Sequence, residues 1–251
     1  MLLYIFIILL ILIILYLICI FINGYVLTYI CNFLYSFETT QDDPYYDTDS
    51  IEWCNILKKN WKVVCDEYQE YVKNNSESIK RFKEIDPHQT FIDTTSIPWD
   101  IILLRSYNRD TELLNSFQKT KKLLPASCSF AMFSILRPGK VLEPHYGPYK
   151  GVLRYHLCIE APQDNQECYI KVKDKKYHWS EGEHVMFDDT FLHSAQNLSS
   201  ENRVILFLDI PRKFKNPFID IMNRTFLNLA KYNKIIINMV KRANEIKLKK
   251  N

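Results

Sequence analysis

Five short segments rich in β-branched and aromatic residues follow one another in the second half of the sequence. They are FAMFSIL, VLRYHLCI, CYIKVK, HVMFD and RVILFLDI, with the turn-forming stretches RPGK, APQDNQE and SEGE among them. Several short strands at close spacing favour a sandwich or barrel over a parallel sheet with crossover helices. The sequence therefore predicts a mainly β core over residues 127–212.

An unbroken apolar run, LLYIFIILLILIILYLICIFI, occupies residues 2–22. A helix of this length can cross a hydrocarbon layer of roughly 30 Å, and the run has no polar face of the kind that a helix packed on a soluble core shows. A cleaved signal peptide is the main alternative, but the run lacks a basic segment before it and a small-residue cleavage site after it. We expect residues 1–24 to form one transmembrane anchor.

The residues after this run give little information on membrane orientation. No Lys or Arg occurs before Lys58, so the positive-inside bias has nothing to act on. We expect the rest of the chain on the luminal side. The segment GYVLTYICNFLYSF is too short to span again, so within residues 25–50 we expect a stretch that lies at the interface or packs on the domain, followed by a polar linker.

Helical patterns flank the predicted β core. Apolar residues recur at near-helical spacing from Ile51 to Val72, which predicts an amphipathic helix at the start of a domain over residues 51–215. The tail, residues 216–251, combines an apolar stripe with many lysines and predicts a basic C-terminal helix. This helix either packs on the domain or rests on an anionic membrane surface, and both alternatives stay open.

Composition excludes some classes of function. The net charge of +3 is too small to indicate nucleic-acid binding. The seven cysteines form no CxxC pair and no zinc spacing, so we expect structural thiols and not a disulfide framework.

Strand alternation places charged residues on inward faces. In VLRYHLCI, Arg154 and His156 share a face, and in RVILFLDI, Arg203 shares a face with Asp209. A buried guanidinium needs an anion, because an unpaired internal charge is costly. Two inward arginines on separate strands therefore predict receptors for the two carboxylates of a small diacid.

Two histidines accompany these arginines. His145 and His193 are each followed, nine or ten residues later, by Arg154 or Arg203 on a strand. Two histidines with a carboxylate and open positions form the usual non-haem Fe(II) oxygenase site. Position 147, where many such sites place the carboxylate, is a glycine.

The motifs FSILRPG, PHYGP, LRYHL, WSEGE, FDDTFLH and NRVILFLDIPR, in this order and spacing, resemble the aspartyl/asparaginyl β-hydroxylase family of Fe(II)- and 2-oxoglutarate-dependent dioxygenases. The resemblance covers roughly residues 129–212. It implies a double-stranded β-helix fold (jelly roll, cupin-like) with flanking helices. The stretches NWKVVCDEY and KNPFIDIMNR resemble the membrane-associated branch of the family that hydroxylates the acyl chain of lipid A.

The resemblance also implies a role for each matching residue. His145 and His193 would bind iron. Ser134 and Arg203 would hold the distal carboxylate of 2-oxoglutarate. Arg154 and His156 would lie near the metal-chelating end of 2-oxoglutarate. In this chemistry O2 is consumed, 2-oxoglutarate leaves as succinate and CO2, and the substrate gains a hydroxyl group.

Two positions bear on the substrate. Gly147 is what the peptidyl aspartyl/asparaginyl branch shows, whereas Val152 stands where that branch has an arginine that grips the acidic side chain of its substrate. Arg105 and Arg109 are candidates to replace that arginine. We expect a membrane-anchored hydroxylase of a protein or lipid substrate near the membrane, of the peptidyl Asp/Asn or a membrane-proximal type. A lipid acyl-chain hydroxylase is the alternative, and a non-catalytic carboxylate-binding or scaffold module is the second one.

Overall fold

The computed structural model describes residues 4, 6, 7, 10, 13, 14, 24–39, 42–75 and 79–245. The anchor expected at residues 1–24 lies, apart from isolated positions, outside the described residues. None of the helices in the described ranges combines the length and apolar character that a membrane span requires.

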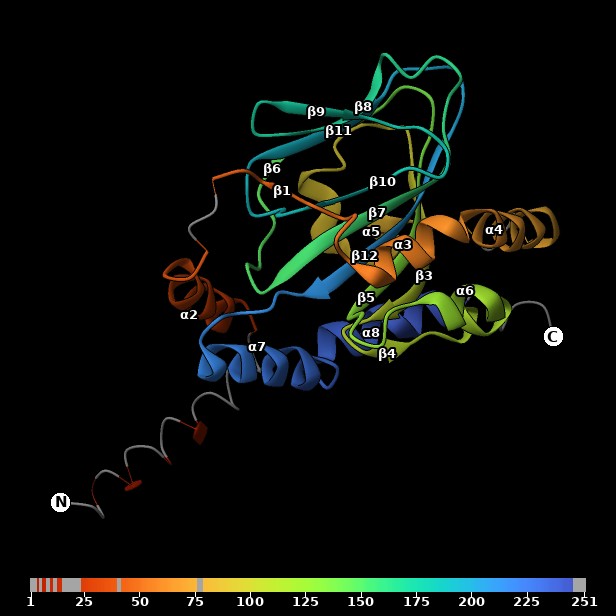
Figure 1. Ribbon diagram of the computed structural model, residues 1–251. Helices are drawn as coiled ribbons and strands as arrows, with labels where there is room; N and C mark the ends of the chain where they lie inside the picture. The colour runs from red at the N-terminus through yellow and green to blue at the C-terminus, as the bar shows by residue number, and fades with distance from the viewer. Residues whose placement is uncertain are drawn as a thin grey trace.

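Two antiparallel sheets face each other across the core (Figure 1). The larger sheet has the strand order β1 (Tyr45–Tyr46), β10 (His184–Phe187), β7 (Val152–Glu160), β12 (Arg203–Pro211), β5 (Phe130–Leu136), β3 (Trp99–Ser106) and β2 (Lys80–Arg81), and β4 (Arg109–Asp110) pairs with β3. The smaller sheet has the order β6 (Lys140–His145), β11 (His193–Asn197), β8 (Cys168–Val172) and β9 (Lys175–His178). The predicted jelly-roll-like arrangement is confirmed.

The five predicted strands correspond to β5, β7, β8, β10 and β12. The prediction missed β3, because WDIILLRS is buried on both faces and reads as a continuous apolar run instead of an alternation. It also missed β6, which contains Pro144, and β11, whose sequence HSAQN is largely polar. These two strands form the centre of the functional site described below.

Helices cover the outer face of the larger sheet. The helices α3 (Glu52–Lys59), α4 (Trp61–Asn75) and α6 (Gln118–Leu123) lie beside this face in Figure 1, and they share one apolar cluster with side chains such as Phe133, Tyr155 and Leu206. The predicted amphipathic helix is therefore present, with a break at Asn60, whose backbone leaves the helical conformation and caps α3.

The predicted C-terminal helix is two helices, α7 (Pro217–Ala230) and α8 (Lys234–Asn244). The break is at Asn233, whose side chain accepts a hydrogen bond from the Ile235 N–H and so starts α8. α8 packs against β3 and against the short helix α5 (Phe82–Ile85), with Ile236, Met239 and Val240 buried. Of the two alternatives for the tail, α8 takes the packed one.

Residues 24–36 form the helix α2 (Gly24–Ser36), which packs on the domain beside α7. Cys31 and Tyr35 are buried against Tyr149, Phe214 and neighbouring apolar residues. Asn32 donates to the Pro148 carbonyl (2.8 Å) and accepts from the Lys150 N–H (2.8 Å). α2 is therefore fixed to the loop between β6 and β7.

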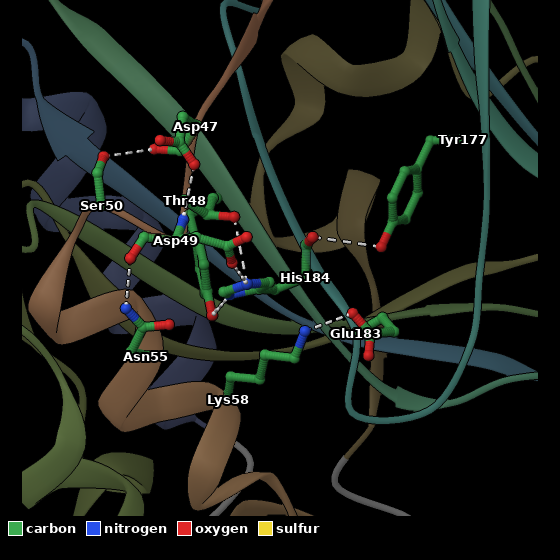
Figure 2. Close-up of polar contacts among 10 residues, drawn as sticks. Asp47, Thr48, Asp49, Ser50, Asn55, Lys58, Tyr177, Glu183 and His184 are labelled. Atoms are coloured by element: carbon green, nitrogen blue, oxygen red, sulfur yellow. Dashed lines mark hydrogen bonds and ion pairs between the residues drawn. The ribbon is translucent and has the colours of Figure 1, made fainter.

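The polar linker after α2 is tied to the larger sheet. β1 pairs with β10, and Figure 2 shows the contacts at the start of β10. There, the buried His184 ring contacts the hydroxyls of Thr48 (3.2 Å) and Tyr155 (3.1 Å), and Lys58 pairs with Glu183 (2.6 Å). His184 thus connects the linker to the core.

All six cysteines in the described ranges are buried and unpaired. This agrees with the expected structural thiols.

Candidate active site

His145 and His193 lie opposite each other on the neighbouring strands β6 and β11. Their ring centroids are 4.2 Å apart. Nδ1 of His145 is 2.6 Å from the Glu143 carbonyl, and Nδ1 of His193 is 2.9 Å from the Phe191 carbonyl. Because a carbonyl oxygen can only accept, each Nδ1 carries the proton and each Nε2 keeps a free lone pair. This is the tautomer of histidines that ligate a metal through Nε2.

Burial keeps both imidazoles neutral. Desolvation lowers the pKa of His193 to about 3, and the neighbouring His145 and Arg154 add to the shift. Desolvation is also the main cause of the lowered pKa of His145. Metal ligation requires neutral imidazole, so at pH 7 the pair is ready to bind a cation.

Asp189 lies beside Gly147 and Arg154 at this end of the sheets. The guanidinium of Arg154 contacts Asp189 Oδ2 at 2.8 Å and binds Asp209 through two hydrogen bonds of 3.0 and 3.2 Å. Asp189 Oδ1 is buried and has no hydrogen-bond partner among the described residues. Burial raises the pKa of Asp189 to about 6, although Arg154 opposes this shift.

The donor set fits a divalent iron ion with two protein ligands. No group of three His, Cys, Asp or Glu residues suitable for a metal occurs in the described part of the chain. His145 and His193 would therefore hold the ion through Nε2, and the remaining coordination positions would be filled by a cosubstrate and solvent. Asp189 Oδ1 is an acceptor available to such a solvent molecule.

A second set of free polar atoms lies deeper between the sheets. Nε and Nη1 of Arg203, both ring nitrogens of His156 and Nε1 of Trp179 are buried without a hydrogen-bond partner in the described residues. Burial lowers the pKa of Arg203 to about 10, which measures the cost of holding this charge away from water. Buried hydrogen-bond donors are nearly always paired in proteins. This group of unpaired donors therefore indicates a binding site for an acceptor.

Ser134 lies next to this cluster. β5 and β12 pair with Ser134 opposite Ile205, so the hydroxyl and the Arg203 guanidinium project from the same inner face. The Ser134 hydroxyl accepts a hydrogen bond from Trp99 Nε1 (2.9 Å), which leaves its own proton free to donate. A carboxylate of 2-oxoglutarate would satisfy both donors, so the residues present fit this cosubstrate.

Arg154 differs from Arg203 because the protein itself supplies its anions. Asp209 lies directly opposite Arg154 on β12. The sequence indicated the inward position of Asp209, because strand alternation put it on the same face as Arg203. The partner Asp189 was not predicted, since its contact depends on how the loop before β11 folds. A direct contact between Arg154 and the cosubstrate stays a prediction.

Asp188 holds the loop that carries Asp189 and leads to His193. Its carboxylate pairs with the buried Arg212 and accepts from the N–H (2.9 Å) and the hydroxyl (2.6 Å) of Thr190. Asp188 therefore fixes this turn in place.

A cavity of about 430 Å³ borders the histidine site. Gly147, His145, Arg154 and Asp189 belong to its lining. Much of the remaining wall is apolar and comes in part from the segment that includes the 3-10 helix η2 (Pro87–Phe91), from α7 and from α8. This apolar wall includes Phe91, Ile92, Phe226, Ala230, Ile235, Ile236 and Met239, and the η2 segment adds the polar Asp86, His88 and Gln89. The volume falls in the range of small-molecule sites, roughly 300–1,000 Å³.

As a class, the molecule is a jelly-roll protein whose inner face carries donors for a metal ion and for a small carboxylate. The family described as aspartyl/asparaginyl beta-hydroxylase matches residues 58–213. The chain belongs to this family, and the resemblance seen in the sequence is confirmed.

Relatives with different substrates in their names are similar to the chain. The ornithine lipid ester-linked acyl 2-hydroxylase of Rhizobium tropici is 32% identical over 192 residues, which cover 74% of this chain and 66% of that protein. The human aspartyl/asparaginyl beta-hydroxylase is 35% identical over 78 residues, 31% of this chain and 10% of that protein. The chain thus spans slightly less than two thirds of the bacterial relative and a tenth of the human one.

Solved structures align at lower similarity. A viral collagen prolyl hydroxylase from Paramecium Bursaria Chlorella virus-1, in complex with 2OG, is 13% identical, with a TM-score of 0.34 over 52% of this chain and 90% of that one.

Proposed function

We propose that the protein is an Fe(II)- and 2-oxoglutarate-dependent hydroxylase that acts on the acyl chain of a membrane lipid. The observation that carries the proposal is the apolar cavity that reaches His145. An acyl chain is the class of substrate that such a wall accommodates. The similarity to the bacterial ornithine lipid hydroxylase over 74% of the chain supports the same substrate class.

Each polar group of the site has a task in this proposal. His145 and His193 hold the ion through their free Nε2 atoms, while Arg203 and Ser134 orient the cosubstrate by its distal carboxylate. When bound, iron and 2-oxoglutarate together with O2 supply the oxidising power that converts a C–H bond into C–OH, with release of succinate and CO2.

Charge around the cavity argues against an acidic peptide as the preferred substrate. Arg154, which lines the cavity, is already paired with Asp189 and Asp209. Val152 is buried in the apolar cluster formed with α2 and α7. Neither position 152 nor position 154 therefore provides an unpaired guanidinium that could bind a substrate carboxylate.

The two arginines expected to replace the missing one have other partners. Arg105 pairs with Asp110 at 2.5 Å and donates to the Cys128 carbonyl. Arg109 donates to the Lys231 carbonyl. Neither of them lines the cavity. Arg105 and Arg109 are therefore not supported as replacements for the arginine that binds the acidic substrate side chain in the peptidyl branch.

A peptidyl Asp or Asn substrate is the second candidate. Gly147 favours it, because the peptidyl branch of the family has a glycine at this position. In both cases the membrane anchor over residues 1–24, and a luminal position of the domain, remain part of the proposal.

The test compares the two substrate classes directly. The full chain in lipid vesicles is supplied with Fe(II), ascorbate, O2 and 2-oxoglutarate, and acylated lipids and Asp- or Asn-containing peptides are followed for a mass gain of one oxygen atom. We expect the gain on the lipid acyl chain, its loss in His193→Ala, and no change in His178→Ala, which alters an exposed histidine on β9. A gain on the peptides alone would replace the proposal by the second candidate. If the protein binds neither metal nor 2-oxoglutarate, the non-catalytic alternative is correct.

A further inference from the structure

The outward side of α2 is apolar and exposed. Tyr29, Ile30, Phe33 and Phe37, which follows the helix directly, are between 52% and 77% exposed. The inward side of the same helix carries Cys31 and Tyr35, which are almost fully buried. α2 is therefore apolar on both sides, although only one side has a partner within the described residues. A helix that is apolar all round is normally buried all round.

The first turns of α7 continue this exposed apolar side. Phe218 is 73% exposed and Ile221 is 64% exposed. The Glu38 carboxylate accepts from the N–H groups of Lys215 (2.8 Å) and Asn216 (3.1 Å), so the end of α2 meets the start of α7. The two helices lie together at one end of the molecule (Figure 1). The α2–α7 face is defined here by Tyr29, Ile30, Phe33, Phe37, Phe218 and Ile221.

A face of this kind is more than scattered surface apolarity. Single exposed apolar side chains are common on soluble proteins, but a group gathered on adjoining elements marks an interaction site.

Chain continuity and composition identify the occupant of this face as a lipid bilayer. α2 begins at Gly24, two positions after the end of the apolar run at residues 2–22, which is long enough to span a bilayer. Tyrosine side chains such as that of Tyr29 favour the level of the lipid headgroups, and phenylalanines such as Phe33 are typical of the apolar face of a helix that lies in the interface. Beside Phe218, the exposed Lys213 and Lys215 suit lipid phosphates.

The inner sides of the same two helices border the site. Thr28 of α2, together with Phe226 and Ala230 of α7, lines the cavity that contains His145. α2 and α7 thus separate the exposed apolar face from the cavity by about one helix diameter, roughly 10 Å. An acyl chain withdrawn from a bilayer at this face has only that distance to travel.

We infer that the α2–α7 face rests on the surface of a lipid bilayer and so presents the cavity beside His145 to lipid acyl chains. The inference rests on the proposed function for its choice of substrate, but the contact with lipid is a separate physical claim. It assigns α2 to the membrane interface on its outer side and to the domain on its inner side.

Depth-dependent fluorescence quenching tests this contact. The six described native cysteines are buried, and the seventh, Cys19, is replaced by serine in every variant. A cysteine introduced at Phe33 or Phe218 can then be labelled with a polarity-sensitive fluorophore. The full chain is reconstituted in vesicles of phosphatidylcholine and phosphatidylglycerol that contain spin-labelled lipid. Leu198→Cys is the matched control, since Leu198 is about half exposed and follows β11 in the smaller sheet.

We expect several-fold stronger quenching, and a blue-shifted emission, for Phe33→Cys and Phe218→Cys than for Leu198→Cys. Equal quenching at all three positions would overturn the inference, even if the lipid is hydroxylated. A blue shift without quenching by the lipid would also overturn it, and would indicate a protein partner or a second copy of the chain. Strong quenching without any lipid hydroxylation would support the contact and refute the proposed function, so the two claims fail separately.

Discussion

The carboxylate of Asp189 occupies the space that a side chain on Gly147 would enter. A Cβ atom at Gly147 would lie 2.1 Å from Asp189 Oδ2, and the Gly147 N–H donates to the Asp189 carbonyl at 2.7 Å. The glycine that stands where many iron oxygenases have a carboxylate is therefore required by a carboxylate from the loop before β11. Gly147 and Asp189 form one structural unit.

Gly147→Ala should destabilise the protein by about 1–3 kcal/mol, because the added methyl group overpacks the site. The cost should be clearly smaller in an Asp189→Ala background, where the colliding carboxylate is absent. Denaturant unfolding of the four proteins in this double-mutant cycle measures the coupling. An equal cost in both backgrounds would mean that Asp189 is not what excludes a side chain at position 147.

Arg203→Met should raise the free energy of unfolding of the ligand-free protein, by about 1–4 kcal/mol, since it replaces an unpaired buried charge with an apolar chain of similar length. The same variant should lose the thermal stabilisation that 2-oxoglutarate gives to the wild type. Thermal unfolding with and without 2-oxoglutarate tests both effects. In Arg203→Lys the charge remains but the fork geometry is lost, so we expect weakened 2-oxoglutarate binding and no gain in stability. A destabilised Arg203→Met protein would show that the contact of the guanidinium with the Trp179 ring outweighs the cost of burying its charge.

His145→Ala should weaken binding of Mn(II), used as a redox-stable substitute for Fe(II), on the order of 100-fold or more. The estimate follows because even residues that only orient a ligand change metal affinity by about 10–100-fold. Titration followed by electron paramagnetic resonance gives the affinity without any turnover. Unchanged Mn(II) affinity would remove His145 from the site.

Ala230→Phe should narrow the cavity and shift the preference towards shorter acyl chains, because Ala230 belongs to the apolar wall supplied by α7. The expected result is a several-fold lower kcat/KM for long chains, with 2-oxoglutarate affinity unchanged. Ile237→Phe, on α8 but outside the cavity lining, serves as the control for an added ring. If the two variants show the same chain-length profile, the cavity is not the acyl site.

Glycosylation tests the expected luminal position. Of the three Asn-x-Ser/Thr triplets, those at Asn197 and Asn223 are fully buried, whereas Asn74 is exposed near the end of α4. A luminal domain made in the presence of microsomes should gain one glycan, which endoglycosidase treatment and Asn74→Gln should both remove. A chain that stays unglycosylated and is digested by protease added to sealed microsomes would place the domain on the other side.

Strand alternation in the sequence was sufficient to place the inward polar side chains. The two-residue period puts Ser134 on the inner face of β5, His156 on that of β7 and Arg203 on that of β12, and the structure has all three there. This worked because one face of each strand is packed on the core, so the register leaves a clear pattern.

Contacts between separate loops could not be obtained in this way. The pairing of Arg154 with Asp189 depends on the turn at Asp188 and its buried partner Arg212, which is distant in sequence. The segment around His193 did not look like a strand because four of the five side chains of β11 are polar. Its strand conformation comes from pairing with β6 and β8. Tertiary context decided both features.

The edge strands of the two sheets are poorly suited to pair with strands of other chains. The edge strands of the larger sheet are β1 and β2, each only two residues long, and β2 consists of the charged Lys80 and Arg81. In the smaller sheet, β9 begins with two lysines and β6 contains Pro144. Short, charged or proline-containing edge strands disfavour pairing between the sheets of neighbouring molecules. Aggregation through the strands of the described domain is thereby disfavoured, and the helices are left as its surfaces for association.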